Sequence, residues 1–139
     1  MLTAATLLSA CGSGSNYANN PRPPSPIDLG TSINDHRVSV SPSHFGAGPV
    51  VLVVTNQSSA ARSLRVRTTI IGASCTSPNG TRGPIDQSTS PISPQGTGQL
   101  QVDLCQGRYA VSVDDGAIQA ADLVVGPQRA SAQNQVLQP

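Results

Sequence analysis

The sequence is poor in the residues that build most recognition surfaces. Its 139 residues include no Lys, no Glu and no Trp, and aromatic side chains make up 2% of the chain. With a formal net charge of +1, the chain lacks the basic excess that neutralises nucleic-acid phosphates. It also lacks aromatic platforms on which bases stack and the aromatic anchors of many protein interfaces. We therefore expect no nucleic-acid partner.

Long apolar runs are missing as well. The longest run, residues 50–54, is far shorter than the roughly 20 residues of a membrane-spanning helix. In their place the chain carries 13 Gly and 12 Pro among many Ser, Thr and Val residues. This composition favours strands and turns over helices.

A short apolar segment near the start ends in Leu8-Ser9-Ala10-Cys11 and is followed by Gly and Ser. The tetrapeptide resembles a bacterial lipobox, where a signal peptide is removed and the new terminal cysteine carries lipid. The resemblance implies that residues 1–10 are a signal peptide and that Cys11 is lipidated. It further implies a membrane partner through this anchor, at the outer face of the bacterial cell membrane.

Two features of the N-terminal region refine this expectation. An export signal begins with a positive segment before about 7–15 apolar residues, yet no Lys or Arg precedes Arg22. We therefore expect a truncated signal peptide and an in-frame upstream extension. Residues 11–32, rich in Pro, Ser and Gly, have too little apolar surface to fold and are predicted to form a tether.

Between residues 33 and 126 the hydrophobic pattern has a period of two, which is typical of strands. Turn residues separate the alternating segments, so we expect one all-β antiparallel β-sandwich. Residues 72–97 form a long polar insertion, of the kind that is functional or disordered. Residues 127–139 are predicted to be a disordered tail. The expected strands cover residues 38–40, 49–55, 64–70, 99–104, 108–113 and 123–125.

Four stretches of this domain resemble the cupredoxin-like family, namely residues 40–50, 54–56, 64–66 and 104–111. The resemblance implies a Greek-key β-sandwich. Gln106 stands where the family usually has proline. An immunoglobulin-like sandwich is the alternative, because its members share the Gly-x-Tyr-x-Val pattern that ends at Val111.

The resemblance also shows which copper ligands are missing. A blue-copper site uses two His, a Cys thiolate and a weak axial ligand, often Met. Arg62 falls where the first ligand His is expected, and Val113 falls where the Cys is expected. We therefore expect no copper and no other cofactor. His36 and His44 are weak candidates for a different metal site, although solvated or turn-packed histidines are the more ordinary interpretation.

The cysteines divide into one anchor and one pair. With Cys11 lipidated, we expect Cys75 and Cys105 to form a disulfide, as exported proteins favour. Two buried free thiols are the alternative. Closing a loop of about thirty residues contributes roughly 3–4 kcal/mol in the chain-entropy model.

No catalytic constellation stands out, since the chain has neither a Gly-x-Ser-x-Gly elbow nor a Gly-rich phosphate loop. Arg62, Arg65 and Arg67 are candidates for holding an anionic group. We prefer to interpret them as surface charge paired with neighbours such as Asp103. The sequence thus predicts a non-catalytic structural or binding module, with a cell-envelope protein or an anionic ligand as possible partner. The alternative is a metal-handling protein with a weak site.

Overall fold

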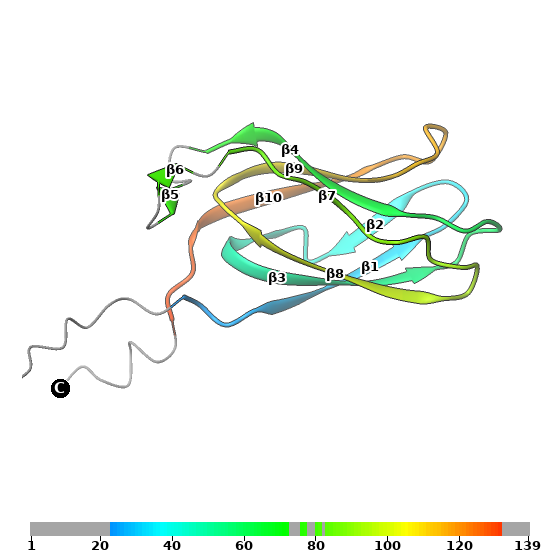
Figure 1. Ribbon diagram of the computed structural model, residues 1–139, viewed down its shortest axis with the longest axis horizontal. Coiled ribbons are helices and arrows are strands. Elements are labelled where there is room, and N and C mark those ends of the chain that lie inside the picture. Colours follow the sequence, from blue (N-terminus) through cyan, green and yellow to red (C-terminus); the bar gives the residue numbers. More distant parts are fainter. Residues whose placement is uncertain (1–22, 73–75, 78–79, 82, 132–139) are drawn as a thin grey trace, which may run out of the picture.

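The computed structural model describes residues 23–72, 76–77, 80–81 and 83–131. In these residues every regular element is a strand (Figure 1). No helix in this part of the chain is long and apolar enough to cross a membrane. The strands are β1 (Ile27–Ile33), β2 (Val38–Ser41), β3 (His44–Asn56), β4 (Leu64–Ile71), β5 (Thr76–Ser77), β6 (Gly80–Thr81), β7 (Asp86–Ser88), β8 (Thr97–Leu104), β9 (Gly107–Val113) and β10 (Ala121–Gln128).

Two layers of strands pack face to face, and β3 belongs to both of them (Figure 1). Residues 44–47 of β3 pair with β10, which continues through β9 and β4 to β7. Residues 48–56 pair with β8 on one side and with β1 on the other, and β2 lies outside β1. The polypeptide thus changes layer at the junction of residues 47 and 48.

The core fills the space between the layers with mostly aliphatic side chains, which come largely from alternate positions of the longer strands. In β1 the buried residues are Leu29, Thr31 and Ile33, and the residues between them are more exposed. Burying a Leu contributes about 1.5–3 kcal/mol relative to leaving it exposed. The largest fully buried aliphatic residues are Leu29, Ile33, Leu52, Leu64, Leu104 and Leu123.

The prediction of an all-β sandwich is confirmed, and all six expected strand regions are strands. The domain is longer than expected at both ends. Strand β1 begins at Ile27, inside the segment assigned to the tether, and β10 runs to Gln128, inside the segment assigned to the tail. The Pro-rich composition before Ile27 concealed the alternating pattern of β1. Residues 1–22 and 132–139, and with them Cys11, lie outside the described residues, as does Cys75.

Two strand pairs are parallel, β1 with β3 and β3 with β10, whereas the sequence predicted antiparallel pairing throughout. The β1–β2 hairpin explains the first of them. Because β2 lies on the outer side of β1, the next strand, β3, reaches the inner side of β1 running in the same direction. An immunoglobulin-like sandwich, the alternative, has two antiparallel sheets, so this mixed pairing favours the predicted cupredoxin-like fold.

The polar insertion contains more regular structure than its composition indicated. Strand β7 pairs with β4 and extends the second layer, while β5 and β6 form a separate two-stranded sheet. Ile92 forms a bridge with Arg62 and packs its side chain into the core. Exposed polar side chains along β7 hid this strand, because an edge strand without a buried face has no hydrophobic period.

The junction of β3 is held by Arg129, which follows β10. The Arg129 guanidinium donates hydrogen bonds to the carbonyls of Ala47 (3.3 Å), Pro49 (2.6 Å) and Ser25 (3.2 Å). Partial burial lowers the pKa of Arg129. Gly48 has φ +135°, and a Cβ there would lie 2.6 Å from the Pro24 ring and 2.9 Å from the guanidinium. Glycine is therefore required where β3 meets Pro24 and Arg129.

Asn56, at the end of β3, is the most extensively bonded buried polar residue in the described chain. Its side chain is inaccessible to solvent. The amide nitrogen donates to the carbonyls of Ala60 and Ile92, both at 2.8 Å, and Oδ1 accepts from Ser58 N and Oγ. These bonds fix the β3–β4 loop against the end of the insertion.

Replacing Asn56 with Ala removes this partner from the buried Ile92 carbonyl, the part-buried Ala60 carbonyl and the Ser58 amide. We expect Asn56→Ala to lower the free energy of unfolding by about 3 kcal/mol, measured by chemical denaturation. The neighbouring exposed residue provides the control, and Gln57→Ala should change stability by less than about 0.5 kcal/mol. Equal small effects of the two substitutions would show that the Asn56 network is not a stabilising element.

Candidate functional site

Four loop segments meet at the end of the sandwich where β3 ends. The β1–β2 turn contacts the β3–β4 loop, where Ile33 O accepts from Gln57 N (2.7 Å). It also contacts the β9–β10 loop, where His36 O accepts from Gln119 N (2.9 Å). The insertion joins through Asn56 N, which donates to Gly96 O at 2.9 Å. We call this the loop end. The described chain begins and finishes at the other end (Figure 1).

Arg62 is the central charged residue of the loop end. Its Nη2 lies 3.1 Å from Asp115 Oδ2, and the two side chains are 16% and 37% exposed. Arg62 Nε is buried and has no hydrogen-bond partner in the described part of the chain. This ion pair joins the β3–β4 loop to the β9–β10 loop.

A second carboxylate, Asp35, lies within range of the Arg62 charge. Hydrogen bonds from the Ser59 backbone and hydroxyl, both at 2.9 Å, are the main reason that the pKa of Asp35 is lowered. The charges of Arg62 and His36 act in the same direction. Asp35 therefore remains an anion at neutral pH and links the β1–β2 turn to the β3–β4 loop.

The residues that occupy the expected ligand positions are unsuited to binding copper. Val113, the last residue of β9, packs its aliphatic side chain in the core, and Arg62 brings a positive charge to a largely buried place. A valine offers no lone pair, and a guanidinium does not lose its proton in proteins. In the part of the chain that the structure describes, no three His, Cys, Asp or Glu side chains are grouped so that they could hold a metal ion.

The two histidines of the sequence are not brought together. His36 lies in the turn before β2 and His44 begins β3, so the extended strand β2 separates them by on the order of 13 Å or more. Both are exposed. His44 Nδ1 lies 3.1 Å from Ser43 Oγ, and the His36 backbone amide donates to Asn34 Oδ1 at 2.9 Å.

The three candidate arginines do not form one group. Arg62 faces the loop end, whereas Arg65 and Arg67 project from the outer face of β4. Arg65 binds Asp86 of β7 with two hydrogen bonds, of which Nε to Oδ1 is 2.6 Å. The sequence indicated Asp103 as a partner, but Asp103 lies on β8 in the other layer. Asp86 was missed because the strand that carries it was not recognised.

The Arg65–Asp86 pair shifts the pKa values of both of its members on the outer face of β4 and β7. Hydrogen bonding from Arg65 is the main cause that lowers the pKa of Asp86, and the charges of Arg65 and Arg67 add to it. The same hydrogen bond raises the pKa of Arg65. Two well-aligned bonds make this a geometrically defined pair, although solvent exposure limits its contribution to stability.

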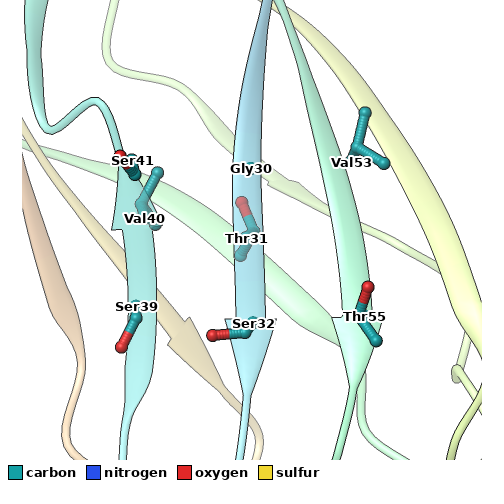
Figure 2. A pocket seen from close by; sticks show the side chains of 8 residues that line it. All are labelled: Gly30, Thr31, Ser32, Ser39, Val40, Ser41, Val53 and Thr55. Carbon is teal, nitrogen blue, oxygen red and sulfur yellow. The ribbon is translucent and has the colours of Figure 1, made fainter.

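A shallow groove of about 390 Å³ crosses the outer face of β1, β2 and β3 (Figure 2). Its lining combines hydroxyl side chains with Gly30 and two valines, and it carries no charge. A second hollow, also about 390 Å³, is formed by residues 89–93 and 96–99. Neither contains a titratable side chain that could act as an acid or a base. The groove is lined by Gly30, Thr31, Ser32, Ser39, Val40, Ser41, Val53 and Thr55.

No protein-family model and no curated protein sequence matches this chain. Among solved structures, dithionite-reduced auracyanin from the photosynthetic bacterium Roseiflexus castenholzii is similar over 73% of this chain and 97% of its own, with 13% identity and a TM-score of 0.48. The multicopper oxidase mgLAC is similar over 81% of this chain and 42% of its own, with 10% identity and a TM-score of 0.43. Similarities at this level carry no conclusion about copper or activity in this chain.

The Arg65–Asp86 pair leads to a prediction about the pKa of Asp86. Arg65→Gln should raise the pKa of Asp86 toward its ordinary value of about 3.9, measured by NMR titration of the carboxyl carbon. Since the folded-state pKa is depressed, the stabilisation is present above the unfolded-state pKa and is lost as pH falls through the folded-state pKa.

Arg67→Gln is the matched control, because Arg67 influences Asp86 only through its charge. It should move the pKa of Asp86 less than Arg65→Gln does. A larger change in the pKa of Asp86 in Arg67→Gln than in Arg65→Gln would contradict the pairing. An unchanged pKa of Asp86 in Arg65→Gln would contradict it as well.

Proposed function

We propose that this chain is a lipid-anchored protein of the outer face of the bacterial cell membrane. Its β-sandwich is a copper-free, cupredoxin-like module that serves structure or interaction and has no catalytic activity. The proposal joins a sequence feature, the lipobox at Cys11, to a structural one, the arginine at the loop end. The structural feature concerns copper, and the sequence feature concerns location.

The observation that carries the copper-free assignment is the Arg62–Asp115 ion pair, with its 3.1 Å separation. In a metal site, ligands from different loops are joined through the cation. Here a fixed positive charge on one loop meets a carboxylate on the other, so the loops are connected without a metal. The guanidinium at this place has no lone pair to offer a metal.

The place where the described residues begin is consistent with an anchor upstream of the domain. Strand β1 starts beside the end of β10, where Arg129 contacts Ser25. The loop end lies at the opposite end of the sandwich (Figure 1). A lipid on Cys11 would therefore hold the domain by one end and leave the loop end directed away from the bilayer.

A disulfide between Cys75 and Cys105 forms part of the proposal. Gly72 N donates to Gln106 O at 2.8 Å, and Ile71 pairs with Gly107. Cys75 follows Gly72 by three positions, a reach of about 10 Å in extended chain. Cys105 directly precedes Gln106, so the sequence allows the two sulfurs to meet.

The partner of the module is a protein of the cell envelope or an anionic ligand. The Arg65 guanidinium is engaged with Asp86, so an anion at Arg65 would have to displace that carboxylate. Arg67 is exposed on the same face. The loop end offers a protein partner a different surface, built from four loop segments, with Asp35 exposed and Asp115 partly exposed in its pair with Arg62.

Mass spectrometry of the protein purified from membranes of its own cells tests this proposal. We expect a chain that starts at Cys11 with the added mass of acyl groups, and two thiols that react with alkylating agent only after reduction. Native spectra should show no metal. Stoichiometric copper or zinc, retained after incubation with Cu²⁺ or Zn²⁺ and lost in His44→Ala or His36→Ala, would establish the metal-handling alternative instead.

A further inference from the structure

Two isoleucines at the end of β4 are unusually exposed. Ile70 is 57% exposed and Ile71 is 49% exposed. Among the large aliphatic residues that the structure describes, Val53 follows at 37%. A β-bulge between Thr68 and Ile70 breaks the alternation of β4 with β9. As a result, adjacent aliphatic side chains both reach solvent.

Positive charge surrounds this apolar pair. Arg108 is the direct cross-strand neighbour of Ile70, and Arg67 lies three positions earlier on β4. Both arginines are exposed. We call Arg67, Ile70, Ile71 and Arg108 the β4 patch.

The acidic groups on the same layer leave the β4 patch positive. Asp86 is bound by Arg65, and Asp122 on β10 lies opposite Ala110, two positions along β9 from Arg108. Among the described residues of this layer, Arg65, Arg67 and Arg108 outnumber Asp86 and Asp122. Asp86 lies opposite Arg67 but is bound by Arg65.

The β4 patch lies at the end of the sandwich where the described chain begins. Ile71 pairs with Gly107, Gly107 with Val125, and Val125 with Phe45, which forms a single row across the layer. Three strand spacings of about 4.8 Å place Ile71 roughly 15 Å from β3. Beyond this row, Arg129, which follows β10, contacts Ser25, which precedes β1.

We propose that the β4 patch contacts the bilayer, with the isoleucines entering the headgroup region and the arginines meeting anionic lipid headgroups. This inference rests on the proposed anchor at Cys11, because a lipid on the segment before residue 23 holds this end of the domain near the membrane. Apolar side chains flanked by basic ones are what interfacial binding uses. The contact is weak alone and becomes effective when a tether raises the local concentration.

A bilayer fits the β4 patch better than a folded partner does. The patch is small and lacks the aromatic anchors that concentrate binding energy in protein interfaces. A fluid headgroup layer requires no matching shape, only apolar side chains and complementary charge. The lipid and the arginines have opposite charges, so the contact should weaken as salt is added.

The absence of native Trp allows a direct test with a single reporter. The full chain carries an N-terminal hexahistidine tag and is held by nickel-chelating lipid on phosphatidylcholine–phosphatidylglycerol vesicles, so attachment does not depend on acylation of Cys11. We expect brominated lipid to quench Ile70→Trp at least about twofold more than Val53→Trp. Val53 is the matched control because it is a partly exposed aliphatic residue on the outer face of the other layer.

The charge of the protein, the salt concentration and the charge of the lipid are varied next. Adding Arg67→Gln and Arg108→Gln to Ile70→Trp, raising the salt, or using phosphatidylcholine alone should each remove about half or more of the excess quenching. Ile71→Trp is the second reporter should Ile70→Trp fail to fold. Equal quenching at positions 70 and 53, or self-association in solution that Ile70→Ser abolishes, would overturn the assignment to lipid. Acylation of Cys11 is measured separately, so failure of the anchor and failure of the patch remain distinguishable.

Discussion

The passage of β3 from one layer to the other is the constraint on which the rest of the structure depends. One strand, held at its bend by three carbonyl contacts from Arg129, aligns β10 with its first part and β1 and β8 with its second. That alignment encloses the aliphatic core. It also separates the molecule into a loop end, where Asn56 closes the strand, and a terminal end, where Arg129 contacts Ser25.

Much of this architecture can be predicted from the sequence, because a strand with one buried face has hydrophobic residues at every second position. Residues 64–70 and 99–104 were recognised in this way, and turn residues marked the limits between them. Strand β1 was missed because proline-rich chain precedes Ile27, and β7 because an exposed edge strand has no buried face. The Arg65–Asp86 pair and the Arg129 contacts join residues far apart in the chain, so no local pattern could reveal them.

The two ends of the sandwich differ in chemistry. At the loop end, polar groups are joined across loops. Arg62 forms an ion pair with Asp115, and Asp35 accepts hydrogen bonds from Ser59. At the terminal end, the exposed isoleucines of β4 stand among arginines. On the proposed account the terminal end faces the membrane, and the loop end, connected by side chains in place of a metal, is presented outward.

The central claim is that Arg62 and Asp115 connect the two loops directly. A double-mutant cycle with Arg62→Gln, Asp115→Asn and the double variant, followed by chemical denaturation at neutral pH, measures that connection most directly. The account predicts a favourable coupling of about 1 kcal/mol or more, as expected for a partly buried ion pair. Additive effects of the two substitutions, with no coupling energy, would contradict it.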